Sequence, residues 1–177
     1  MLFCIWIFRY FLYTNTYLQS VYVNSCLIRA IQDTFAKGEF VEGVSDKTRW
    51  ANTFFDFKMI GSLFESSNRF ISVGQMYGCA ITANCIEGIW EVPIVLGKNL
   101  YGVEITGNYF ELNDTKKGTN IDLSGATGTA EVTISNNLFA EKDNNESDII
   151  LLPPTLKSGY ITVSNNWAPD RANLVVA

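Results

Sequence analysis

The three glutamates Glu65, Glu87 and Glu111 are the first residues of this chain whose type and spacing could support chemistry. They lie 22 and 24 residues apart, close to one constant step. If each closes the same strand of a repeating unit, their carboxylates stack one strand spacing apart, at about 4.8 Å. Like charges at that spacing repel, and such a column could bind a cation or supply a general acid. We take Glu87, the central member, as a catalytic candidate; the alternative is that all three fan out into solvent at a turn.

A second catalytic candidate is Asp122, the middle residue of the apolar segment 121–123. Hydrolysis of a glycoside generally needs two carboxyl groups at a set separation. Asp122 is the sole carboxylate among the five residues that strand alternation predicts to point outward beside one another. These residues are Ser72, Val95, Asp122, Leu151 and Val175. A structural role for Asp122 is therefore the alternative, and the apolar members, joined by Ile149, predict an exposed strip of the kind that marks an interface.

Aromatic side chains and two polar loops are the candidates for ligand binding. Trp90, Tyr109 and Trp167 could stack on sugar rings, or pack on outward neighbours instead. The loops 111–120 and 140–149 carry charges of both signs, among them Asp114 and Asp143, and variable loops are common places for binding specificity. Each loop also contains a glycosylation sequon, at Asn113 and Asn145.

Composition excludes several other classes of chemistry. The chain has 177 residues, a net charge of -5 and no histidine, so Ser-His-Asp and Cys-His catalysis and histidine-ligated metals are ruled out. An acidic balance argues against nucleic acid as a partner. Phosphate-loop and zinc-site spacings are absent, so no cofactor and no metal are predicted. No apolar stretch approaches the 18 or so residues of a membrane span.

An internal repeat indicates which elements position these residues. Five segments of eight residues align: 57–64, 79–86, 103–110, 132–139 and 161–168. Their starts are 22, 24, 29 and 29 residues apart, which suits one turn of a solenoid per repeat. Positions one and three of each segment are apolar and position two is mostly polar, which predicts a short strand with one face buried.

The second half of each segment predicts a bend and a ladder. Position five is Gly61, Ala83, Gly107, Asn136 and Asn165. Glycine and asparagine tolerate positive φ, so a sharp bend is expected there. Position six is Ser62 and then four asparagines, whose side-chain amides can bond to one another and to the turn backbone. This structural ladder consists of Asn84, Asn108, Asn137 and Asn166.

A third strand recurs between the segments, at 71–73, 94–96, 121–123, 150–152 and 174–176. Its steps follow those of the first set. Three strands per repeat, joined by sharp bends, predict a triangular prism whose stacked repeats pair through parallel sheets.

This pattern resembles the right-handed parallel β-helix superfamily, the pectin-lyase-like fold of pectate lyases, polygalacturonases and phage tailspikes. The phrases Ile-Thr-Gly-Asn-Tyr-Phe at 105–110 and Ile-Ser-Asn-Asn-Leu-Phe at 134–139 carry the resemblance. We therefore expect an all-β, right-handed parallel β-helix solenoid with about five recognisable coils. A β-sandwich is the alternative, but sandwich strands do not repeat asparagine in phase.

The two ends of the chain predict a piece of a longer helix. We assign residues 53–177 to the β-helix and residues 1–52 to an irregular segment or to degenerate coils, with a short helix at 25–35 as a further alternative. Residue 177 falls within a strand position with no polar cap after it. Missing coils of a longer chain, or a partner, would cover that end. The apolar strip could pack against another subunit of a homotrimer, as in tailspike assemblies.

The resemblance implies a polysaccharide-interacting protein, extracellular or virion-associated, similar to a tailspike or a carbohydrate-active enzyme. The alternative is a structural or adhesive solenoid without glycan chemistry. We expect no cleavage by this chain alone, because no acid pair is visible on the strands that face the usual cleft. If the chain is active, a polysaccharide lyase or glycoside hydrolase is the class expected. We also predict that Cys79 is a buried thiol and that it forms no disulfide with Cys85.

Overall fold

The architecture is all-β and parallel. The computed structural model describes residues 3–5, 10–14, 17–29, 34–38, 53–111, 113, 119–140, 149–168 and 175–176. Throughout these ranges the regular elements are strands, with no helix among them. Every strand pairing within them is parallel.

The strands form two hydrogen-bonded sheets, of which the smaller has six strands. Neighbours in this sheet are separated in sequence by one repeat, so each strand pairs with its counterpart in the repeats before and after it. In spatial order the strands are β1 (Phe3–Ile5), β5 (Leu27–Arg29), β9 (Leu63–Ser67), β12 (Cys85–Ile89), β14 (Tyr109–Glu111) and β17 (Leu138–Ala140).

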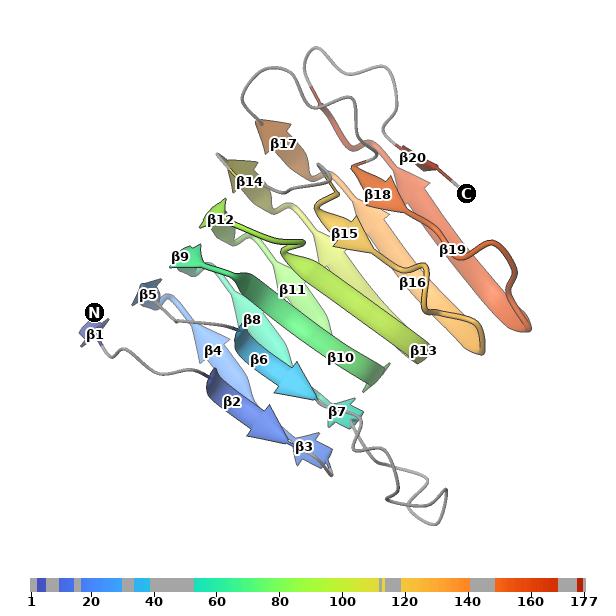
Figure 1. Cartoon of the computed structure of the whole chain (residues 1–177), viewed down its shortest axis with the longest axis horizontal. Coiled ribbons are helices and arrows are strands. Elements are labelled where there is room, and N and C mark those ends of the chain that lie inside the picture. The colour runs from blue at the N-terminus through green and yellow to red at the C-terminus, as the bar shows by residue number, and fades with distance from the viewer. Residues whose placement is uncertain are drawn as a thin grey trace.

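The larger sheet has fourteen strands and occupies the two layers seen in Figure 1. One layer contains β2 (Tyr10–Thr14), β6 (Thr34–Gly38), β10 (Arg69–Tyr77), the start of β13 (Ile94–Thr106), β15 (Ile121–Asp122), β18 (Ile150–Leu151) and β20 (Val175–Val176). The other contains β4 (Tyr22–Asn24), β8 (Lys58–Ile60), β11 (Ala80–Thr82), the end of β13, β16 (Thr129–Ser135) and β19 (Ser158–Ser164). The short strand β3 (Tyr17–Gln19) pairs with the short strand β7 (Thr53–Phe55), and β7 pairs with the end of β10.

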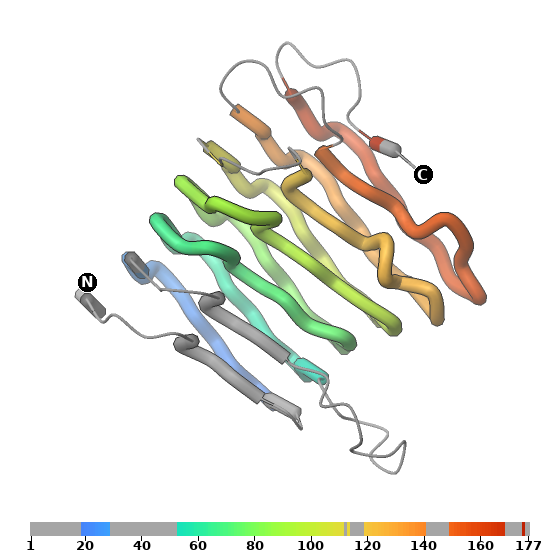
Figure 2. The backbone as a smooth tube through the Cα atoms, viewed as in Figure 1, coloured from blue at the N-terminus to red at the C-terminus, as the bar shows by residue number. Residues whose placement is uncertain are grey.

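Successive repeats pair residue by residue. Ile105, at position three of its segment, is in register with Ile81 before it and with Ile134 after it. The same register continues from Ile134 to Val163. Figure 2 shows these repeats following one another in chain order along the stack. The alignment of the five segments in sequence is therefore also their alignment in space.

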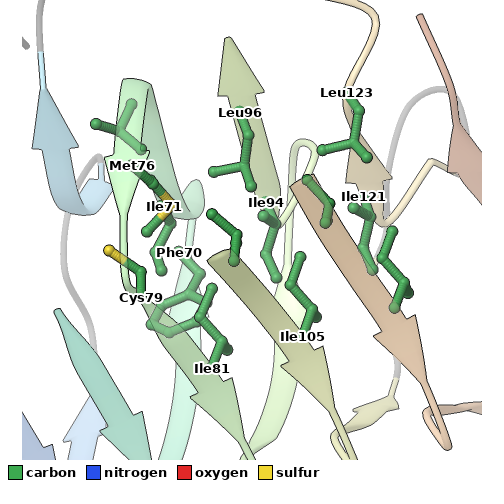
Figure 3. Packing of buried hydrophobic residues seen from close by; sticks show 14 of the residues in the cluster. Phe70, Ile71, Met76, Cys79, Ile81, Ile94, Leu96, Ile105, Ile121 and Leu123 are labelled. Carbon is green, nitrogen blue, oxygen red and sulfur yellow. The ribbon is translucent and has the colours of Figure 1, made fainter. Parts of the chain in front are cut away.

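The core lies between the layers and is built from the inward positions of every strand. Figure 3 shows Ile81 of β11 together with Ile94 and Ile105, from the start and the end of β13, in the same hydrophobic cluster. Phe110 and Phe139 stack with their ring centroids 4.8 Å apart. All five are at most 1% exposed. Each fully buried side chain of this size stabilises the fold by about 1.5–3 kcal/mol relative to exposure, so the stacked rows hold the repeats together.

The sharp bend predicted at position five is confirmed. Gly61, Ala83, Gly107, Asn136 and Asn165 all have positive φ, between 54° and 64°. Ser25 has a φ of 51° at the equivalent place before β5. A left-handed residue therefore turns the chain at the same point of each of these repeats, whether or not it is glycine.

Three expectations need correction. Val175 pairs with Ile150, and Val176 pairs with Leu151, so the last third strand is shifted by one residue from the predicted phase. Ile149 is fully buried and so does not join an exposed strip, because it precedes β18 and the alternation of that strand does not extend to it. The alternative of a helix at 25–35 is wrong where the chain is described, since residues 27–29 form β5 and β6 begins at residue 34.

Candidate functional site

The outer side of β9, β12, β14 and β17 brings together more of the predicted site residues than any other described surface. We call it the glutamate face. Two rows of side chains run across these strands at one strand spacing. The first row is Leu63, Cys85, Tyr109 and Leu138, continued by Trp167 through an isolated bridge to Leu138. The second row is Glu65, Glu87, Glu111 and Ala140.

The second row places three carboxylates side by side. Glu87 is in register with Glu65 on one side and Glu111 on the other. All three side chains are half-buried, and the row ends at Ala140. Ionised carboxylates only accept hydrogen bonds, so this row is a line of acceptors suited to hydroxyl or ammonium donors.

Partial burial and the nearby carboxylates raise the pKa values of two side chains in the neighbouring row, Tyr109 and Cys85. Partial burial, and then the charge of Glu111 and its hydrogen bond, raise the pKa of the Tyr109 phenol. Burial also raises the pKa of the Cys85 thiol, and the charges of Glu87, Glu111 and Glu65 raise it further. Cys85 therefore remains a thiol near neutral pH and is not an activated nucleophile.

Two of the three predicted aromatic residues belong to this face. Tyr109 and Trp167 lie on either side of Leu138, and Trp167 is 61% exposed. Trp90 is equally exposed, but it follows the left-handed bend at Gly88 and so lies beyond the end of the two rows. Its backbone bonds to Ser67. Trp90 is thus not part of the glutamate face.

Asp122 and Glu87 are not brought together. Asp122 lies on β15 in the larger sheet, whereas Glu87 lies on β12 in the smaller one. The neighbours of Asp122 in register are Val95 and Leu151. Its Oδ1 accepts the backbone N–H of Ser124 at 2.8 Å, which gives this carboxylate a place in the turn that follows β15. These contacts fit a structural role.

The four ladder asparagines lie in one column. Asn84 Nδ2 donates to Asn108 Oδ1 at 3.0 Å, Asn108 Nδ2 to Asn137 Oδ1 at 3.0 Å, and Asn137 Nδ2 to Asn166 Oδ1 at 2.9 Å. The same oxygens also accept the backbone N–H of the preceding asparagine. The ladder therefore satisfies the turn backbone and offers nothing to a ligand.

Of the candidate residues in the two polar loops, the structure describes only Asn113. Asp114, Asp143 and Asn145 lie outside the described residues. Asn113 is only 4% exposed, its Oδ1 accepts the N–H of Ile89 at 2.9 Å, and its Nδ2 donates to Asn120 at 3.1 Å. The sequon at Asn113 is therefore not available for glycosylation in the folded chain, because the side-chain amide is buried and hydrogen-bonded within the protein.

Two surface clusters were not anticipated from the sequence. Phe55, Tyr77 and Tyr101 form a stack on the outside of β7, β10 and β13, with centroid distances of 5.0 and 4.7 Å. Tyr22 donates a hydrogen bond to Asp56, which also pairs with Lys58 at 2.9 Å. A signal for the stack was present, since Tyr77 and Tyr101 lie 24 residues apart, the repeat step at that point.

Comparisons with known proteins do not extend these observations. No family model, curated protein or solved structure matches the chain. Within the described residues, no group of three histidine, cysteine, aspartate or glutamate side chains is placed to hold a metal ion. The same residues include no helix long and apolar enough to cross a membrane.

Proposed function

We propose that this chain is a right-handed parallel β-helix of the pectin-lyase-like type and that it binds a polysaccharide on the glutamate face. The fold proposal is supported by parallel pairing at one repeat step, by three strand positions per repeat and by a left-handed bend at a fixed position of each. The proposal places the protein outside the cell or on a virion, where such polymers are found.

The observation that carries the binding proposal is the pair of matched rows on the glutamate face. A linear polysaccharide presents hydroxyl groups and flat apolar ring faces at regular intervals. In this row Glu87 and Glu111 offer carboxylate acceptors one strand spacing apart, and charge-assisted hydrogen bonds are the stronger kind. Tyr109 and Trp167 offer aromatic surface beside them, which suits the apolar face of a sugar ring. The sheet holds the backbones of both rows in place, so no backbone segment has to be ordered at binding.

We propose binding without cleavage at this face. A glycosidase needs one carboxylic acid and one carboxylate that act on opposite sides of the scissile bond. Glu65, Glu87 and Glu111 instead follow one line on one sheet, and Asp122 lies in the other sheet. Any cleavage would need groups from further coils or from a neighbouring subunit of a homotrimer.

A glycan array probed with the full chain tests the proposal. We expect a defined set of polysaccharide fragments to bind, and Trp167→Ala and Glu87→Gln each to weaken their binding roughly three- to tenfold. Trp90→Ala is the matched control, because Trp90 has the same exposed fraction of 61% but lies off the face. Equal losses from the two tryptophan variants would reject the glutamate face as the site.

A scaffold without glycan chemistry is the second candidate, and one observation favours it. The inward residues of β19, Ile161 and Val163, are only half-buried, whereas their counterparts Val132 and Ile134 are fully buried. Partly uncovered core positions at a sheet edge suit a further layer of protein. An array that stays blank with a chain that melts cooperatively would favour this function.

A further inference from the structure

The stack of Phe55, Tyr77 and Tyr101 does not end at Tyr101 but is interrupted there. The ring of Tyr101 lies nearly parallel to that of Tyr77, with an interplanar angle of 17°, so one of its faces is covered and the other is turned toward the next strand, β16. On β16 the outward residue at this place is Glu131, and on β19 it is Tyr160. The row thus runs ring, carboxylate, ring.

The register fixes this order. Leu100 pairs with Ala130 and Val103 with Val132, so the single residue Glu131 stands opposite both Tyr101 and Gly102. Glu131 is itself in register with Tyr160. Glu131 alternates with the buried residues Ala130 and Val132 and therefore points outward. Tyr160, in register with Glu131, is 60% exposed and lies on the same side. In Figure 1 the strands β13, β16 and β19 lie side by side.

The spacing suits an organic cation. Two strand spacings separate the backbones that carry Tyr101 and Tyr160, about 9.6 Å. Because Glu131 stands on the strand between them, an ammonium group paired with its carboxylate would be flanked by both rings, within the roughly 6 Å range of cation–π attraction. Glu131 supplies a carboxylate at the same level. An aromatic residue in place of Glu131 would have continued the stack from Tyr101 to Tyr160. The carboxylate is therefore the feature that favours a positively charged ligand.

The chain already fills one site of this composition with its own lysine. Lys58 Nζ lies 5.2 Å from the centroid of the Tyr22 ring and 2.9 Å from Asp56 Oδ1. These residues also lie on the outer surface of the larger sheet. Among the described residues, Glu131 has no ion-pair partner, and the second ring, Tyr160, is 60% exposed.

Space beside the rings is open. A Cβ added at Gly102 would meet only the Cα of Gly78, at 4.0 Å. Gly78 in turn has nothing within 4 Å of an added Cβ. The two exposed glycines therefore leave a bare strip next to Tyr77 and Tyr101, along which a bulky group attached to the cation can lie.

We propose that Tyr101, Glu131 and Tyr160 form a binding site for an organic ammonium group, and that the group it takes is the amine of an amino sugar in a polysaccharide. The choice of polymer rests on the proposed function. It is favoured by the net charge of -5 and by the glutamate face, because an acidic surface attracts a cationic polymer and repels a polymer of uronic acids.

Binding of a glucosamine tetramer, compared with a tetramer of N-acetylglucosamine, tests the site. The two ligands share one backbone and differ in the charge of the amine. We expect the full chain to bind the glucosamine tetramer at least fivefold more tightly in titration calorimetry, with a preference that falls as salt is added. Glu131→Gln and Tyr160→Ala should each weaken that binding, roughly three- to tenfold.

Glu104→Gln is the matched control, since it removes the same charge from an exposed position on β13 that faces Ala80 and Thr133 and no aromatic ring. It should leave the preference unchanged. Equal binding of both tetramers would overturn the ammonium site and leave the proposed polysaccharide function standing. Failure of the glucosamine tetramer to bind would also overturn the site, while the glycan array would still decide the proposed function. A preference that Glu104→Gln abolishes and Glu131→Gln does not would show general charge attraction and reject the site.

Discussion

Asn108 donates two hydrogen bonds to one oxygen of Asn137, from its backbone N–H at 2.9 Å and from its side-chain amide at 3.0 Å. Its second amide hydrogen reaches the carbonyl of Ile81 at 2.8 Å, and its own Oδ1 accepts from Asn84. One side chain, 1% exposed, therefore connects the repeat before it to the repeat after it. Because these groups are buried, water cannot replace a lost partner, and each group depends on the hydrogen bond that it makes here.

Asn108→Leu should lower the free energy of unfolding by roughly 1–3 kcal/mol. Leucine has similar volume, but it removes the acceptor of the Asn84 N–H and one donor to the carbonyl of Ile81. Urea unfolding of both chains measures the difference. Asn166→Leu is the control, because Asn166 is half-buried at the last position of the ladder, and water can replace part of its bonding. An Asn108→Leu chain as stable as the original would contradict a buried ladder.

Substitutions of Gly107 test whether the bend at position five requires a left-handed backbone. Its φ is +64°, and an added Cβ would meet only the backbone nitrogen of Ala83, at 3.9 Å. Space is thus available, and the cost of Gly107→Ala comes from the left-handed backbone, about 1 kcal/mol. Gly107→Asn should cost less, because asparagine occupies this conformation more readily and already does so at Asn136 and Asn165. Thermal melts of the two variants check the order; alanine more stable than asparagine would contradict it.

These bends and the ladder could be predicted because their residues repeat in phase. Ala83 and Gly107 differ in type, yet both stand one place before a ladder asparagine, and that place alone marks the turn. The alternation of Val103 and Ile105 predicted the buried face in the same way. Residue type and repeat position together predicted the bends, the ladder and the buried face. The parallel pairing of successive repeats could be predicted for the same reason.

Other features could not be predicted from the eight-residue pattern. The strands before residue 52 carry no asparagine in phase, so β2 and β6 had no marker. Val175 lies in a strand of two residues, which is too short for its alternation to set a register. Trp90 is a candidate from its residue type alone, since it lies outside the aligned segments, and the left-handed bend at Gly88 places it beyond the glutamate face. Tyr77 and Tyr101 lie outside the aligned segments.

The cluster of Tyr22, Asp56 and Lys58 predicts a dependence of stability on pH. Hydrogen bonds from Tyr22 and Lys58 hold the pKa of Asp56 below its ordinary value. A lowered pKa in the folded state means that the stabilisation is present above the ordinary pKa, near about 4, and is lost as the pH falls through the folded value. Asp56→Asn should therefore be less stable than the original chain at pH 7 and equally stable in strong acid.

Asparagine is the suitable substitution because Asp56 has a φ of +51°, which asparagine also tolerates. Melts at pH 7 and in strong acid measure the two differences. A gap between the chains that persists unchanged in acid would show that the effect of the substitution is not the loss of the charge at this carboxylate.

The thiols provide the last prediction. Cys79 is 1% exposed, Cys85 is half-buried on the glutamate face, and neither forms a disulfide. Alkylation requires the thiolate, and burial followed by the charges of Glu87, Glu111 and Glu65 raises the pKa of Cys85. Iodoacetamide should therefore modify Cys85 slowly at pH 8, and Cys79 not at all until the chain unfolds. Mass spectrometry of the digested protein follows each site separately.

Glu87→Gln should accelerate the modification of Cys85. Removing the carboxylate that is first among the charges acting on this thiol lowers its pKa, so a larger fraction is thiolate at the same pH. The side chain keeps its size, and access to the sulfur is unchanged. Glu104→Gln, which removes an equal charge from the larger sheet, should leave the rate as it was, and added salt should reduce the difference between the variants. If Glu87→Gln and Glu104→Gln changed the rate equally, the carboxylates of the glutamate face would not be acting locally on Cys85, and the register that places them beside it would be wrong.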